Sequence, residues 1–190
     1  MIIFGKLFKP LGYWKIKHGE KRWFDWILPV CMALAATYVL GCLPKPIVLI
    51  GDKSLISLVN GLLQILSGFY IASMAAVATF QKDGMDDKLD GKSVTLNGKP
   101  VSRRQFLTYL FGYLAYMSIL MYFAGGFAQL AHSSLSTWLS EMNQLIKPTI
   151  VFCYFFFIFN ILCTTVLGMH FMIDRIHREK ATLNDNKKGD

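Results

Sequence analysis

Four long apolar stretches dominate this 190-residue chain. They run roughly over residues 24–43, 55–80, 106–130 and 149–173. Each is about long enough to cross a hydrocarbon layer of ~30 Å as a helix that rises 1.5 Å per residue. A backbone in lipid must satisfy its polar groups internally, so we expect each stretch to be a helix. The predicted fold class is an all-α membrane protein, a bundle of four transmembrane helices spanning residues 24–180.

The basic residues predict how these helices are oriented. Lys and Arg number 6 before the first stretch, then 2, 6 and 1 in the successive gaps, and 5 after the last stretch. Basic loops stay preferentially in the cytoplasm. The alternation predicts that both termini and the loop 81–105 are cytoplasmic. Contact of this basic side with anionic lipid is enough to explain the net charge of +8. The charge therefore needs no nucleic-acid ligand, and we expect direct nucleic-acid binding to be unlikely.

The two ends of the chain are predicted to lie outside the bundle. Residues 1–23 mix aromatic and basic side chains, a composition typical of a segment in the cytoplasmic interface. Asp25 follows, where it is either hydrated or paired with Lys21 or Arg22. Residues 181–190 form a polar tail.

The cytoplasmic loop 81–105 carries two local signals. An Asn97-Gly98 step between short β-prone runs predicts a β-hairpin between the second and third spans. Ser102 with Gln105 three residues later predicts a capping box at the start of the third span.

Polar and small side chains on the second and fourth spans are candidate helix-packing or pore-facing positions. Asn60 and Gln64 are spaced to share a helix face, and a small-xxx-small row follows them that permits close helix contact. His170 is expected either to be buried, hydrogen-bonded or snorkelling, or to relay protons with Asp174. The full set is Asn60, Gln64, Gly68, Ala72, Ala76, Asn160, Thr164 and His170.

The third span carries a tyrosine row, Tyr109, Tyr113 and Tyr116. Aromatic side chains at this spacing pack against a neighbouring helix, and a hydroxyl can bond across it. A ligand or lipid pocket is the alternative interpretation.

Charged side chains on the cytoplasmic side are candidate contacts for a partner protein or for lipid. They are Asp86, Asp87, Lys92, Lys99, Arg103, Arg104, Arg175 and Arg178. The acidic run over residues 83–90 lacks the alternation of a calcium-binding loop, so we expect no metal site there.

Enzymatic chemistry is not supported. No nucleophile elbow, zinc-binding helix motif or phosphate-cradling loop is present, and the acidic residues lie at span borders or in loops. We therefore expect neither an enzyme nor a cofactor site. The polar helix faces instead suit self-association, and the cytoplasmic surface suits a protein partner.

Three strings, LLQILSGFYIASMAAVATF, SRRQFLTYLFGYLA and TTVLGMHFMIDRIHREK, carry a resemblance. In size, pass number and texture the chain resembles small multi-pass membrane proteins of bacterial anti-phage defence operons, such as the membrane subunit of Kiwa systems or retron-linked membrane effectors. The resemblance implies an inner-membrane component that oligomerises and couples to a cytoplasmic partner, to sense infection or disrupt the membrane. A pore-forming, holin-like protein is the alternative from a different class.

Overall fold

The computed structural model describes residues 8–16, 21–44, 47–51, 53–79, 95–96, 99–141 and 146–186. Within these ranges four helices are long and apolar enough to cross a membrane: Trp23–Cys42, Leu55–Thr79, Arg103–Leu130 and Ile146–Met172. Their bounds differ from the predicted spans by at most 3 residues, at 103 against 106 and at 146 against 149. The prediction of a helical, multi-pass membrane protein is confirmed.

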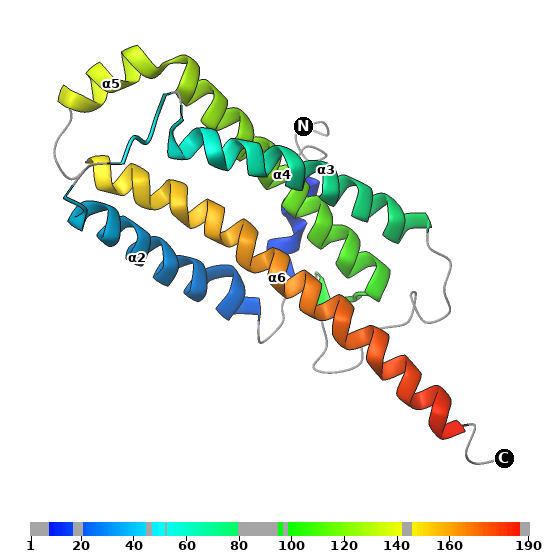
Figure 1. Cartoon of the computed structure of the whole chain (residues 1–190). Helices are drawn as coiled ribbons and strands as arrows, with labels where there is room; N and C mark the ends of the chain where they lie inside the picture. The colour runs from blue at the N-terminus through cyan, green and yellow to red at the C-terminus, as the bar shows by residue number, and fades with distance from the viewer. Residues whose placement is uncertain are drawn as a thin grey trace.

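The helices form two antiparallel pairs that pack against each other (Figure 1). Helix α2, Leu28–Cys42, lies along α6, Ile146–Asn186. Helix α3, Leu55–Thr79, lies along α4, Arg103–Leu130. A short helix, α5, His132–Glu141, follows α4, and α6 extends beyond the other helices towards the C-terminus.

Helix α4 is the centre of the bundle. In its most apolar stretch 56% of the residues are buried, against 17–28% in the corresponding stretches of the other three spans. Leu110 and Leu114 are fully buried in it. Close contact with α6 depends on Gly168, because a Cβ there would lie 2.9 Å from Leu110 Cδ2. Helix α4 is therefore the element on which the rest of the chain packs.

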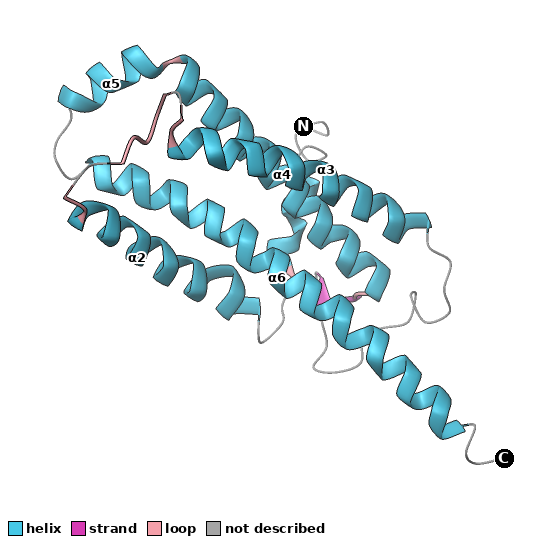
Figure 2. Ribbon diagram, viewed as in Figure 1, coloured by secondary structure: helices cyan, strands magenta, loops and turns pink. Residues whose placement is uncertain are grey.

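Local sequence explains how α4 begins. Ser102 Oγ accepts a hydrogen bond from the Gln105 backbone N–H, and Gln105 Oε1 accepts one from the Ser102 N–H, so the predicted capping box is present. Just before it, β1, Thr95–Leu96, pairs antiparallel with β2, Lys99–Pro100 (Figure 2). Both strands are only two residues long.

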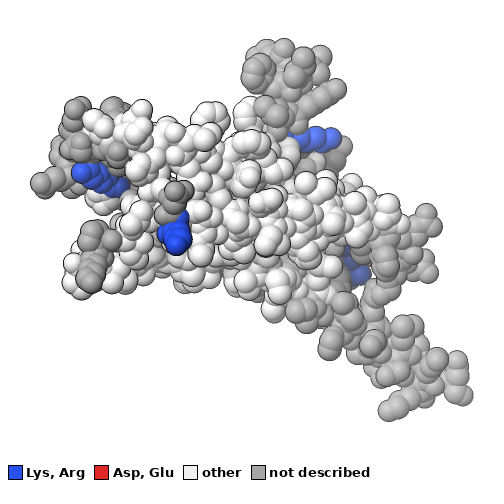
Figure 3. Space-filling model, turned by 45° about the horizontal axis from the view of Figure 1, so that its top comes forward, with Lys and Arg blue, Asp and Glu red and all other residues white. Residues whose placement is uncertain are grey.

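Large apolar side chains cover much of the outer surface. Leu58, Ile65, Phe127 and Leu130 are each more than 70% exposed. On the face shown in Figure 3 the described surface is uncharged over most of its area, with Lys and Arg in a few separate places. A water-soluble monomer rarely exposes so much contiguous apolar surface. Contact with lipid acyl chains accounts for it.

The N-terminal segment packs on the bundle through η1, a 3₁₀ helix over Lys9–Lys15. Tyr13 and Ile16 are buried, whereas Trp14 is 45% exposed. The Tyr13 ring stacks on Tyr113 of α4, with ring centroids 5.0 Å apart. The described part of the predicted interfacial segment 1–23 is thus anchored on the protein through α4.

Candidate functional site

A buried ion pair stands out among the described residues. Lys21 Nζ lies 3.5 Å from Asp25 Oδ2, one helical turn away, and the two residues are 6% and 3% exposed. Of the alternatives left open by the sequence, Asp25 therefore pairs with Lys21, while Arg22 is exposed. Ionised side chains are rarely buried unless paired, so we take this pair as the centre of the candidate site.

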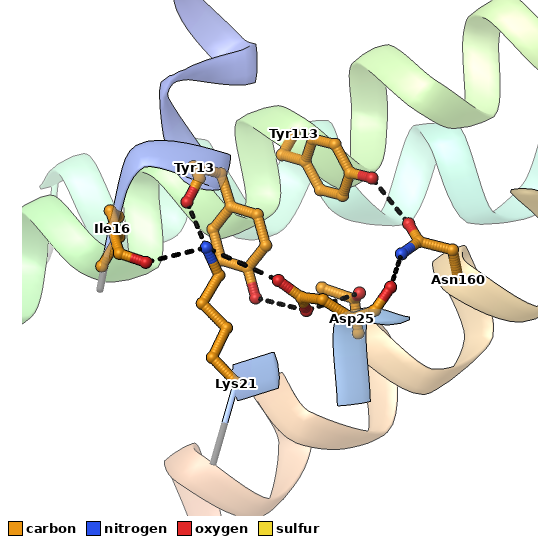
Figure 4. Close-up of polar contacts among 7 residues, drawn as sticks. Tyr13, Ile16, Lys21, Asp25, Tyr113 and Asn160 are labelled. Atoms are coloured by element: carbon orange, nitrogen blue, oxygen red, sulfur yellow. Dashed lines mark hydrogen bonds and ion pairs between the residues drawn. The ribbon is translucent and has the colours of Figure 1, made fainter. Parts of the chain in front are cut away.

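The N-terminal segment supplies three of the partners of this ion pair (Figure 4). The Tyr13 hydroxyl donates to Asp25 Oδ1 at 3.1 Å. Lys21 Nζ donates to the backbone carbonyls of Tyr13 and Ile16, and lies 4.0 Å from the centroid of the Tyr13 ring. The ammonium group is thus held by one carboxylate, two carbonyls and one aromatic face.

The other partners come from the spans. Asn160 of α6 donates from Nδ2 to the Asp25 carbonyl at 2.7 Å and accepts from the Tyr113 hydroxyl of α4 at 2.6 Å. Thr164 Oγ1, one turn after Asn160, lies 3.4 Å from Asp25 Oδ1. The prediction that a hydroxyl of the tyrosine row can bond to a neighbouring helix is confirmed for Tyr113, which bonds from α4 to Asn160 of α6. We call Tyr13, Lys21, Asp25, Tyr113, Asn160 and Thr164 the polar cluster.

The local backbone explains how Asp25 reaches this position. Residues Trp23–Ile27 form a π-helical turn, η2, directly before α2. A π turn widens the helix by one residue and is frequent at functional sites. Pro29 follows this turn inside a continuous helix and lacks the N–H that would reach the carbonyl four residues earlier, that of Asp25, which accepts from Asn160 Nδ2 instead. The turn directs Asp25 towards α6 while Trp23 and Trp26 remain exposed.

The cluster lies well inside the bundle as measured along α4. Tyr113 follows Arg103, the first residue of α4, by ten residues, which corresponds to about 15 Å of helix. Asp25 lies at the border of its own span, as the sequence predicts, and its backbone carbonyl contacts Asn160 in the middle of the fourth span. Ionisable residues within or beside transmembrane helices are candidates for functional sites.

Burial and the neighbouring carboxylate act on the protonation of the N-terminal partners. Burial lowers the pKa of the Lys21 ammonium, and the neighbouring Asp25 carboxylate acts in the opposite direction. Burial raises the pKa of the Tyr13 phenol well above its ordinary value, and Asp25 reinforces the shift. Tyr13 therefore remains a hydrogen-bond donor to Asp25 at any physiological pH.

The predicted helix-packing or pore-facing residues separate into three groups. Asn160 and Thr164 belong to the polar cluster. Asn60 is buried between α3 and α4, where its amide lies over Gly125. The rest of the set is exposed on the outer faces of α3 and α6: Gln64, Gly68, Ala72, Ala76 and His170.

Asn60 and Gln64 therefore do not share one environment, since Asn60 is buried and Gln64 is exposed. Four residues rotate a helix by about 40° beyond a full turn, and the edge of the buried face falls between the two side chains. These amides and the Thr164 hydroxyl do not line one common path through a single chain. Asp174, the predicted relay partner of His170, has a side chain outside the described part.

The predicted cytoplasmic contacts are placed only in part. Arg104 donates from Nη1 to the Val77 and Ala78 carbonyls at the end of α3, at 3.4 and 3.3 Å. Arg103 opens α4, and the backbone of Lys99 lies in β2. For Arg175 and Arg178 the structure describes a helical backbone in α6. Asp86, Asp87 and Lys92 lie outside the described residues.

Sequence reasoning did not find Tyr13 and Tyr113 as partners of one site. Tyr13 lies 12 residues before Asp25, and Asn160 lies 135 residues after it. The available signal was an acid with a nearby base at the start of an apolar span, which marks a charge that needs a partner. Nothing in the local pattern specifies which distant polar groups complete it.

Comparison with protein-family models, with curated proteins and with solved structures found no match to this chain. The four apolar helices and the buried ion pair define the class of the protein, a multi-pass helical membrane protein with a buried polar cluster. In the described ranges no group of three or more His, Cys, Asp or Glu side chains is placed to hold a metal ion.

Proposed function

We propose that this chain is an inner-membrane component of a bacterial anti-phage system, with both termini in the cytoplasm. In this proposal it oligomerises in the membrane and couples to a cytoplasmic partner, to sense infection or to disrupt the membrane. The resemblance of its three strings supports the biological setting. The polar cluster supports the coupling between a cytoplasmic partner and the spans.

The polar cluster connects a segment on the predicted cytoplasmic side to the spans. Lys21 and Tyr13 precede the first span, whereas Tyr113 and Asn160 lie within α4 and α6. Buried ion pairs gain little net stability over apolar packing, and their best-attested roles are in specificity and switching. A partner that pulls on η1 would remove the Tyr13 hydroxyl from Asp25, the Tyr13 carbonyl from Lys21 and the Tyr13 ring from Tyr113 of α4, so the ion pair would lose its N-terminal partners. The polar cluster is thus suited to transmit a cytoplasmic event into the bundle.

The function is tested in cells that carry the gene with its native neighbours and are challenged with phage. We expect protection against at least one phage, and we expect Asp25→Asn to reduce it at equal protein level in the membrane because Lys21 loses its counter-charge. Plaque counts and a membrane-potential dye are the measurements. Arg22→Gln, an exposed cation one residue after Lys21, is the matched control.

The outcomes separate the two classes of function. Depolarisation by wild-type protein in uninfected cells would contradict a regulated component and favour a pore-forming protein. Full protection by Asp25→Asn would contradict the coupling role of the polar cluster. Depolarisation or protection only after infection supports the proposal.

The exposed small-residue face of α3 supports oligomerisation. A Cβ added at Gly68 would meet no atom within 4 Å, so this glycine is not needed for contacts inside the chain. Ala72 and Ala76 continue the same face. Small residues at this spacing allow two transmembrane helices to approach closely. A second copy of α3 is the partner we propose.

We expect Gly68→Leu to weaken self-association at least tenfold while leaving the fold of the monomer intact, because the leucine separates the helix backbones. Energy transfer between labelled chains in vesicles, at several protein-to-lipid ratios, measures it. Gly126→Leu on α4 is the control, since its Cβ also meets open space. Equal association of wild type and Gly68→Leu would rule out this face as the interface.

A further inference from the structure

Three of the four spans reach a common level on the side of the N-terminus. Arg104 Nη1 donates to the Val77 and Ala78 carbonyls, so α3 ends beside the start of α4. The rings of Phe106 and Phe171 pack with their centroids 4.9 Å apart, which brings α6 to the same place. We call the level of Phe106 and Phe171 the N-side end of the bundle.

The first span begins short of the N-side end, and Figure 1 shows α2 beginning part-way along α6 while α3 and α4 continue further. Asp25 is near the start of this span and bonds to Asn160, which bonds to Tyr113. Tyr113 follows Phe106 by seven residues, or about 10 Å along α4. Phe171 follows Asn160 by eleven residues, or about 16 Å along α6. The first span therefore starts about 10–16 Å below the N-side end.

Side chains typical of a membrane–water interface gather at this lower level. Trp23, the first residue of the span, is exposed, and so are Trp14 and its neighbour Lys15 on η1. The centroid of the Trp14 ring lies 5.9 Å from that of Tyr113, which fixes the level of η1 beside the polar cluster. Tryptophan rings collect at the headgroups, and a lysine beside apolar surface extends its ammonium group to them. The edge of the hydrocarbon layer on this side is thus expected at the polar cluster.

The opposite face of α6 stays apolar much nearer the N-side end. Val166 and Met169 are each more than half exposed. They follow Asn160 by six and nine residues, or about 9 and 14 Å along the helix. At 3.6 residues per turn they are rotated by about 240° and 180° from Asn160, so they face away from Asp25. Burial among acyl chains removes these side chains from water, so the hydrocarbon layer on this face extends past the level of the polar cluster.

We propose that the leaflet on the N-terminal side is stepped around this protein. Phospholipid headgroups lie at the level of Lys15 and Trp23 on one side of the bundle, and acyl chains cover Val166 and Met169 on the other. The partner of this surface is the lipid bilayer itself, which is thinner by about 10 Å beside η1 than along the outer face of α6.

The step explains how an ion pair is accommodated beside the middle of the fourth span. Lys21 and Asp25 bond within a cluster that includes Asn160. Local thinning of a bilayer is one way in which charged groups within a membrane approach the headgroups and water. The thin side brings the headgroups to the level of η1, so a molecule in solution could reach the polar cluster from there. This inference concerns the lipid around the protein and does not depend on the anti-phage role.

The test measures how fast single cysteines react with a water-soluble maleimide in the full-length protein, held in lipid nanodiscs. The four native cysteines are replaced by alanine. One cysteine is then introduced at an exposed position, as Lys15→Cys, Trp23→Cys, Val166→Cys or Met169→Cys. We expect the first two to react at least about tenfold faster than the last two, because the reactive thiolate forms in water and not in hydrocarbon. Trp23→Cys retains the Lys15 cation, so it measures the step with that charge in place.

Ile65→Cys is the matched control, because Ile65 is exposed near the middle of α3 and gives the rate for a thiol among acyl chains. Each variant unfolded in SDS gives the rate of the same thiol without the fold. Reaction of Val166→Cys and Met169→Cys as fast as that of Trp23→Cys would overturn the proposal, because α6 would then stand in water above a level boundary. Reaction of Lys15→Cys and Trp23→Cys as slow as that of Ile65→Cys would overturn it too, since η1 would then be immersed in acyl chains.

Discussion

Replacing Asp25 by alanine should lower the free energy of unfolding by about 3–5 kcal/mol, the usual cost of leaving one member of a buried pair alone. Lys21 would keep its positive charge at 6% exposure, with only the Tyr13 and Ile16 carbonyls as hydrogen-bond acceptors. The Tyr13 and Thr164 hydroxyls would lose a shared acceptor. Loss of helicity with increasing SDS in mixed micelles measures the effect.

A double variant distinguishes a lone charge from a simple loss of packing. Lys21→Met with Asp25→Leu removes both charges and retains apolar volume, so it should cost less than Asp25→Ala alone. Arg22→Met, which changes the adjacent exposed cation, should alter stability by less than about 0.5 kcal/mol. If the double variant were as unstable as the sum of its single changes, Lys21 and Asp25 would be acting independently.

The second large effect is expected at Gly125, where alanine should destabilise the protein by about 1–3 kcal/mol. A Cβ at this position would lie 2.4 Å from Asn60 Oδ1, closer than such atoms can approach. Asn60 is 8% exposed, and α3 and α4 form the most extensive helix contact in the described bundle. The amide must therefore move, and the two helices with it. The same SDS titration measures the loss.

The neighbouring glycine makes the comparison sharp. Gly126→Ala meets no atom within 4 Å, so it should be neutral or stabilise the helix by up to about 1 kcal/mol. Asn60 Oδ1 has no hydrogen-bond partner among the described residues. Asn60→Ala should consequently rescue much of the loss in Gly125→Ala, and a positive coupling in the double-mutant cycle tests this. Equal effects of alanine at 125 and 126 would contradict the close contact.

The parts of the fold that the sequence predicted are those with local causes. Because a backbone in lipid must be helical, the four apolar stretches predict four helices. The ends of these stretches lie within 3 residues of the ends of the observed helices. Ser102 and Gln105 lie three residues apart, so their capping box needs no information from elsewhere. The tyrosine row on α4 indicated helix packing, and Tyr113 is fully buried in it.

The rest depends on which face of each helix turns inward. Gly68 and Gly125 are both glycines on long spans, yet a Cβ meets open space at Gly68 and Asn60 at Gly125. The low amphipathicity of membrane helices hides this distinction, because lipid-facing and protein-facing side chains are both apolar. The polar cluster was hidden for a second reason. Its members come from η1, η2, α4 and α6, and only tertiary packing brings Tyr13, Asp25 and Asn160 together.

The length of α6 has a mechanical consequence. Its 41 residues form a rod about 60 Å long, roughly twice the thickness of a hydrocarbon layer. The 14 residues of α6 that follow Met172 extend about 21 Å past the span, and Figure 1 shows this arm projecting beyond the other helices. A tilt of about 10° at the membrane would displace its tip by roughly 4 Å through leverage alone. Asn160 lies on the same helix and bonds the Asp25 carbonyl, so a tilt of α6 about this bond would be enlarged at the far end of the arm.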